Sequence, residues 1–125
     1  MYFLPDKDVF DKINDYAEDG KLGKLERLAL NNSDYRVRRA AYRGIGRIRA
    51  DASTEFIFET LEKKLESEPK VLIAVAESLG RLANRNDFEK IQHIAADYDD
   101  PEVYKAMMDA ATEAKGRSPR NLVVK

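Results

Sequence analysis

A repeat of about 33 residues is the feature that most constrains the fold of this chain. Three segments align without gaps: VRRAAYRGIGRI, VLIAVAESLGRL and VYKAMMDAATEA, which begin at Val37, Val71 and Val103. Each has alanine at the third position after its valine and small or apolar residues at the fourth, eighth and eleventh. These positions share one face of a helix. A fixed period of this length predicts stacked helical units that bury their apolar faces against one another.

Each segment is preceded by a helix-start signal, SDYR, SEPK or DDPE, with Ser or Asp as N-cap and proline near the first turn in two of them. A second amphipathic stretch lies upstream of each: KLGKLERLAL, TEFIFETLEKKL and DFEKIQHIAADY. A further helix over residues 6–18 has Asp8, Asp11 and Asp15 on its outer side and is expected to cap the stack. The sequence thus predicts seven helices and no strands.

We therefore predict an all-α, right-handed α-solenoid of about three helix pairs with an N-terminal capping helix. Residues 1–116 form one domain, made of the capping helix 6–18 and pairs over 21–49, 53–83 and 87–115. Residues 117–125 leave the helical pattern after Gly116 and are expected to be a flexible tail. The alternative for this basic tail is docking on a neighbouring surface such as the acidic third repeat.

The repeat unit resembles a known family. The pattern D/S-x-x-x-V-x-x-A-A-x-x-x-I/L-G, seen best in SDYRVRRAAYRGIG and SEPKVLIAVAESLG, resembles the HEAT-like repeat of phycobilisome-lyase-type proteins. The third unit departs from it by having Thr112 where Gly46 and Gly80 stand, and we expect these glycines to allow close helix packing. The resemblance implies that the second helix of each pair lines a concave surface. The resemblance also implies that chromophore handling is a possible function. The chain has no specific feature for it and no cysteine.

Few residues could carry out chemistry. With no cysteine there is neither a disulfide nor a thiolate, which fits a reducing cytoplasm. The one histidine, His93, is expected to be a partly buried packing residue. We expect Glu66, Glu68 and the segment DYDD at 97–100 to cap helices and contact solvent, because no third type of metal ligand accompanies them.

Other motifs exclude further classes. RGIGRI follows no predicted strand and is therefore not a phosphate loop. The start MYFLPDKDVF lacks the basic and apolar regions of a signal peptide, and no apolar run could span a membrane. We predict a cytoplasmic protein that is not an enzyme and uses no cofactor or metal.

The segment SDYRVRRAAYRGIGRI carries five arginines and no acid after Asp34, although the chain has a net charge of −1. On a helix, Arg36, Arg39, Arg43 and Arg47 form one stripe, apart from Arg38 and Arg49. The corresponding positions are Lys70, Ile73, Glu77 and Arg81 in the second repeat, then Glu102, Lys105, Asp109 and Glu113 in the third. Their formal charges are +4, +1 and −2.

This charge gradient favours a protein or peptide ligand with an acidic patch over a nucleic acid. A nucleic acid needs positive charge along its path, and the third repeat would repel it. We therefore predict a protein-interaction module, a scaffold or adaptor, with Ile73 as an apolar anchor. The predicted partner-binding residues are Arg36, Arg39, Arg43, Arg47, Ile73, Glu77 and Arg81.

Three alternatives stay open at this point. Nucleic acid could bind at the first repeat alone through its arginine stripe. The chain could be a non-catalytic subunit of an enzyme, or the stripe could be only a solvated helix face. The oligomeric state and the partner do not follow from the sequence.

Overall fold

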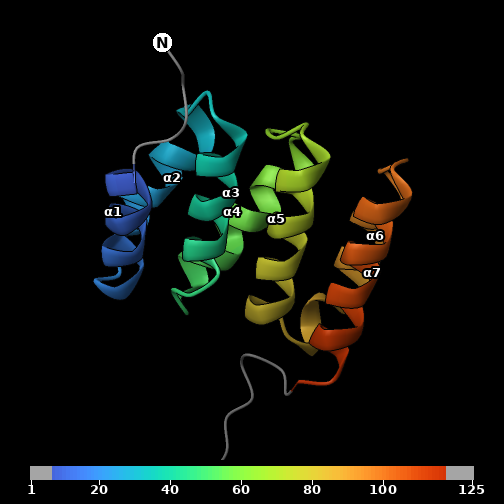
Figure 1. Ribbon diagram of the computed structural model, residues 1–125. Helices are drawn as coiled ribbons and strands as arrows, with labels where there is room; N and C mark the ends of the chain where they lie inside the picture. Colours follow the sequence, from blue (N-terminus) through green and yellow to red (C-terminus); the bar gives the residue numbers. More distant parts are fainter. Residues whose placement is uncertain (1–6, 118–125) are drawn as a thin grey trace, which may run out of the picture.

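In the computed structural model, which describes residues 7–117, the chain is all-helical (Figure 1). Over that range seven α-helices and one short 3₁₀ helix follow one another without a strand, as predicted. Their bounds are α1 Lys7–Glu18, α2 Leu22–Asn31, α3 Tyr35–Ile45, α4 Asp51–Glu62, α5 Pro69–Leu82, η1 Arg85–Asp87, α6 Phe88–Ala95 and α7 Pro101–Lys115.

The helices form two layers. The pairs α2 with α3, α4 with α5 and α6 with α7 each pack together, and α1 packs beside α3. The second helices α3, α5 and α7 lie side by side in the front layer of Figure 1, with α1 at their end. The first helices α2, α4 and α6 scarcely touch one another. The predicted α-solenoid of three helix pairs is confirmed.

The starts of the second helices follow from their capping residues. Asp34 and Asp100 accept hydrogen bonds from backbone N–H groups of the first turns of α3 and α7. Glu68, rather than the expected serine, caps α5 by accepting from the backbone of Lys70 at 3.2 Å. Prolines at the first positions of α5 and α7 have no N–H to satisfy there.

The core runs continuously between the layers. α5 lies between α3 and α7, and eight of its fourteen residues are buried, which explains why its sequence is apolar on nearly every side. Tyr42 is fully buried, although it lies outside the apolar face predicted for α3. Its ring stacks on Phe56 at 6.0 Å, and its hydroxyl lies 3.2 Å from Thr60 Oγ1.

The glycines at the shared repeat position permit close helix contact. A Cβ on Gly46 would lie 2.5 Å from Ser78 Oγ and 3.1 Å from Ser78 Cα of the next second helix. A Cβ on Gly80 would likewise meet the Glu113 side chain and lie 3.4 Å from Ala110 Cα. The expectation of close packing at both glycines is confirmed.

Two helix bounds differ from the expected ones. The α3 helix ends at Ile45, so Arg47 lies in the following turn instead of on the helix. Glycine is the weakest helix former after proline, and Gly44 and Gly46 flank this end. The α4 helix begins at Asp51, two residues before the expected start. Most of the predicted tail, from residue 118 onward, lies outside the described residues.

Candidate partner-binding face

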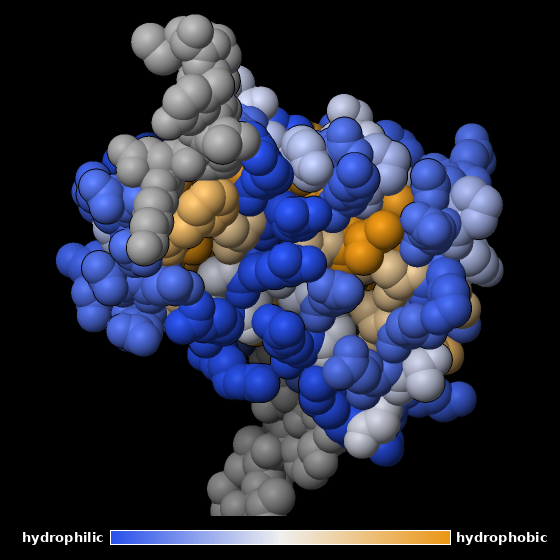
Figure 2. Space-filling view, in the orientation of Figure 1, coloured by the Kyte–Doolittle hydropathy of each residue, from blue (hydrophilic) through white to orange (hydrophobic). Residues whose placement is uncertain are grey.

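The second helices and the turn after α3 carry the residues that the sequence singled out. We call this set the charged face and define it by Arg36, Arg39, Arg43, Arg47, Lys70, Ile73, Glu77, Arg81, Glu102, Lys105, Asp109 and Glu113. Figure 2 shows the side of the molecule formed by α3, α5 and α7, which is mainly hydrophilic with a hydrophobic area between α5 and α7. Ile73 is partly buried and packs against the core.

The first arginine of the stripe is neutralised within its own turn. The Arg36 guanidinium donates from Nε and Nη2 to the two carboxylate oxygens of Asp34, at 3.2 and 3.0 Å. Hydrogen bonding to Arg36 lowers the pKa of Asp34 below its ordinary value. The only acid in the arginine-rich segment is therefore occupied by its neighbour.

Arg43 lies near an acidic side chain of the next repeat. Its Nη2 lies 3.9 Å from Glu77 Oε1 on α5, and both side chains are about half exposed, at 52% and 51%. Arg47, in the turn after α3, donates to the neutral side chain of Asn14 on α1 at 3.1 Å. Arg47 thus contacts the capping helix through a neutral side chain, which does not balance its charge.

Arg39 has a different environment. Its guanidinium carbon lies 5.5 Å from the centroid of the Tyr35 ring, and the Nζ of Lys70 on α5 lies 5.4 Å from the same centroid. Neither cation forms an ion pair within residues 7–117. This is the point of the charged face at which positive charge from two repeats converges.

The third repeat carries the opposite charge. Lys105 pairs with Asp109 at 2.9 Å, and Glu113 lies 3.6 Å from Nη2 of Arg117. Glu102 is exposed at the first turn of α7. By formal charge the face therefore runs from basic at α3 to acidic at α7. Of the predicted site residues, Arg43 lies beside Glu77, and Arg81 is exposed near the end of α5.

Arg38, outside the stripe, joins two repeats. It donates through Nε and Nη2 to the carboxylate of Glu66, at 2.9 and 3.1 Å, and Glu66 is only 6% exposed. Glu66 also accepts from the backbone N–H groups of Ser67 and Glu68. The carboxylate expected to be solvated is thus a buried link between α3 and the turn before α5.

Arginines that follow the second helices make a second kind of link. Each donates to a carbonyl at the end of a neighbouring second helix: Arg49 to Arg81 at 3.1 Å, Arg85 to Lys115 at 3.2 Å, and Arg117 to Gly80 and to Ala83, the latter at 2.9 Å. The last carbonyls of a helix have no partner within it, so these bonds satisfy them. Arg49 is therefore also structural.

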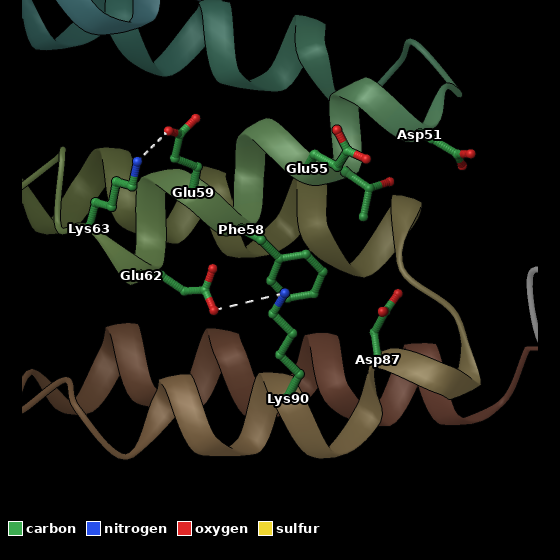
Figure 3. A pocket seen from close by; sticks show the side chains of 9 residues that line it. Asp51, Glu55, Phe58, Glu59, Glu62, Lys63, Asp87 and Lys90 are labelled. Atoms are coloured by element: carbon green, nitrogen blue, oxygen red, sulfur yellow. Dashed lines mark hydrogen bonds and ion pairs between the residues drawn. The ribbon is translucent and has the colours of Figure 1, made fainter.

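A groove on the other layer contains many charges (Figure 3). It has a volume of about 590 Å³ and is lined by Asp51, Thr54, Glu55, Phe58, Glu59, Glu62, Lys63, Asp87 and Lys90. Lys90 Nζ lies 4.1 Å from the Phe58 ring centroid and 3.8 Å from Glu62, while Lys63 pairs with Glu59 at 2.8 Å. The lining includes one hydroxyl, that of Thr54, and no histidine.

The remaining candidates for chemistry are isolated. His93 is exposed on α6, so the prediction of a partly buried packing residue was wrong. It follows the buried Ile91 by two positions, which on a helix turns it away from the core. Within residues 7–117 no group of three or more His, Asp or Glu side chains is placed to hold a metal ion. No helix in that range combines the length and apolar character needed to cross a bilayer.

Comparison with known proteins agrees with this architecture. A family model described as HEAT repeats matches residues 24–114, which covers all three helix pairs. No curated protein and no solved structure matches the chain.

Proposed function

The chain belongs to the HEAT-repeat family, and from that premise we propose that it is a scaffold that binds a segment of a partner protein on its charged face. HEAT repeats generally act as protein-interaction scaffolds, and proteins built from them are typically not catalytic. The proposal therefore assigns the chain no reaction. We place this role in the cytoplasm, and a chain without cysteine fits that reducing compartment.

The shape of the helix stack supports this choice of face. The second helices pack directly on one another, whereas the first helices scarcely touch. When two layers of a stack differ in this way, the tightly packed layer lies on the inside of the curve. Extended concave surfaces of solenoids are suited to long, continuous ligands.

The observation that carries the proposal is the change of sign along this face. Where α3 meets α5, Arg39 and Lys70 form no ion pair within residues 7–117. The α7 helix carries Glu102, Asp109 and Glu113, and the last two pair with Lys105 and Arg117. A partner segment that is acidic over α3 and basic over α7 would complement both ends. Such complementarity fixes the register and orientation of a bound segment.

Nucleic acid is the competing ligand. A strand that crossed the whole face would approach the acids of α7, and neutralising phosphates is the main source of its affinity. A strand confined to α3 would meet two arginines already occupied by Asp34 and Glu77. Both arguments favour a protein partner.

Affinity capture from the native cell, after nuclease treatment, tests this proposal. The parent is compared with the double variant Arg39→Glu and Arg43→Glu. The matched control, Lys12→Glu and Arg27→Glu, makes the same change of net charge on α1 and α2. We expect the control to retain a protein that the face variant loses. Equal recovery by all three proteins, or recovery that nuclease abolishes, would contradict the proposal.

A further inference from the structure

One aromatic ring on the charged face is shared by two cations from different repeats. Tyr35 is the first residue of α3, is partly buried and packs against the core. Arg39 approaches its ring from one turn further along α3, at 5.5 Å, and Lys70 from the first turn of α5, at 5.4 Å. The ring thus holds both cations at the junction between the first and second repeats.

The acids around this junction are occupied by other groups. Asp34 pairs with Arg36, and Glu66 pairs with Arg38. Glu68 accepts from the backbone N–H of Lys70 as the N-cap of α5. Two positive charges therefore converge on a tyrosine ring, and neither forms an ion pair within residues 7–117.

We propose that an anionic side chain of the partner segment, a carboxylate or a phosphate, binds between Arg39 and Lys70 beside Tyr35. This inference rests on the proposed function and assigns the anchoring contact within it. Arg39 supplies a planar set of donors that matches a carboxylate or phosphate, and Lys70 adds a compact charge from the next repeat. Because the two cations come from different repeats, the site exists only when α3 and α5 are packed together.

The same geometry excludes the other arginines of the stripe as the anchor. Arg36 already makes two hydrogen bonds to Asp34, so an incoming anion would compete with an intact pair. Arg43 lies 3.9 Å from Glu77, whose charge would repel an anion. Arg47 lies in the turn after α3, where it donates to Asn14 of α1. The anchor is therefore one local site and not a diffuse positive surface.

Nuclear magnetic resonance of the isotope-labelled full chain tests the inference with two defined probes. One is an acetylated peptide of glycine and glutamate, and the other is the same peptide with phosphoserine in place of glutamate. We expect saturable shifts at the side-chain signals of Arg39 and Lys70 and at the Tyr35 ring, larger than those at Arg36 and Arg43. Saturation by only one peptide identifies carboxylate or phosphate as the source of the anion.

Neutral variants make the test specific. Arg39→Gln and Lys70→Gln should each weaken probe binding at least about fivefold, whereas Arg36→Gln and Arg43→Gln should change it less than about twofold. Tyr35→Phe, which keeps the ring, should bind as the parent does, and Tyr35→Leu should bind more weakly while its circular dichroism stays helical.

Two results would overturn the inference. One is equal weakening by Arg39→Gln and Arg43→Gln, and the other is the absence of saturable binding for both probes. If the face variant still loses its captured protein when either result is found, the proposed function stands and only the assignment of the anchor fails.

Discussion

The guanidinium of Arg38 and the buried carboxylate of Glu66, 28 positions apart in the chain, meet in a two-bond ion pair at 2.9 and 3.1 Å. Arg38 also donates to the backbone carbonyls of Asn32 and Ser33. Through these contacts Arg38 joins the start of α3 to the turn before α5. The link fixes how two adjacent repeats stack.

Replacing Glu66 by alanine should therefore destabilise the protein by about 2–4 kcal/mol, because it leaves a partly buried guanidinium and two backbone N–H groups without their acceptor. Urea unfolding measures the change. The control is Lys63→Ala, which removes an ion pair whose side chains are 65% and 47% exposed. That control should leave the urea midpoint almost unchanged, because an exposed ion pair contributes little to stability. A loss for Glu66→Ala no larger than the control's would show that the link contributes nothing.

A substitution at Gly46 tests whether α3 and α5 need to approach closely at this position. Alanine at this position would place a Cβ 2.5 Å from Ser78 Oγ, so α3 and α5 must move apart. We expect Gly46→Ala to lower the free energy of unfolding by about 1–3 kcal/mol. Gly23→Ala is the matched control, since nothing lies within 4 Å of its added Cβ in α2. It should stabilise the helix by up to about 1 kcal/mol. Changes of the same sign at both glycines would contradict this packing account.

The buried hydroxyl of Tyr42 should make the free energy of unfolding depend on pH in the alkaline range. Burial raises the pKa of its hydroxyl from 10.0 to about 12. A folded-state pKa above the unfolded one contributes stability that is complete below pH 10 and is lost as the pH rises toward about 12. Tyr42→Phe keeps the ring on Phe56 and should reduce this loss, at a cost near pH 7 of about 1 kcal/mol for the hydrogen bond to Thr60. Urea unfolding at pH 7 to 11 measures it. An identical pH dependence in parent and variant would contradict this assignment.

The layout of the helices was predictable because it depends on periodic features. Every unit repeats the same apolar spacing, so the position of each helix and of most core residues follows from the sequence. The capping roles of Asp34 and Asp100 and the close contact at Gly46 are also local or repeated features. The match of a family model over residues 24–114 has the same origin.

Other features were not predictable because they depend on contacts between repeats. Nothing in the sequence distinguishes Glu66 from an acid on the surface. Its pairing with Arg38 depends on how the two repeats stack. Tyr42 is buried because Phe56 and Thr60 of α4 cover it. The apolar spacing within α3 does not predict this contact with another helix. The four arginines of the stripe look equivalent in the sequence. In the fold, Arg43 lies beside an acid of the next repeat, Glu77, and Arg39 does not form an ion pair within residues 7–117.

The central claim is that the charged face binds a protein whose charge complements its own, and reversing its acidic end tests this most directly. In the double variant Asp109→Lys and Glu113→Lys, like charges come to lie beside Lys105 and Arg117. Both acids are more than half exposed, so the melting temperature should fall only slightly. Equilibrium binding of the captured protein, and of a single-stranded oligonucleotide across a range of salt concentrations, is then measured for parent and variant. We predict at least about tenfold weaker binding of the protein by the variant. Unchanged protein binding, or measurable oligonucleotide binding by the parent that tightens and becomes more salt-dependent in the variant, would contradict the account.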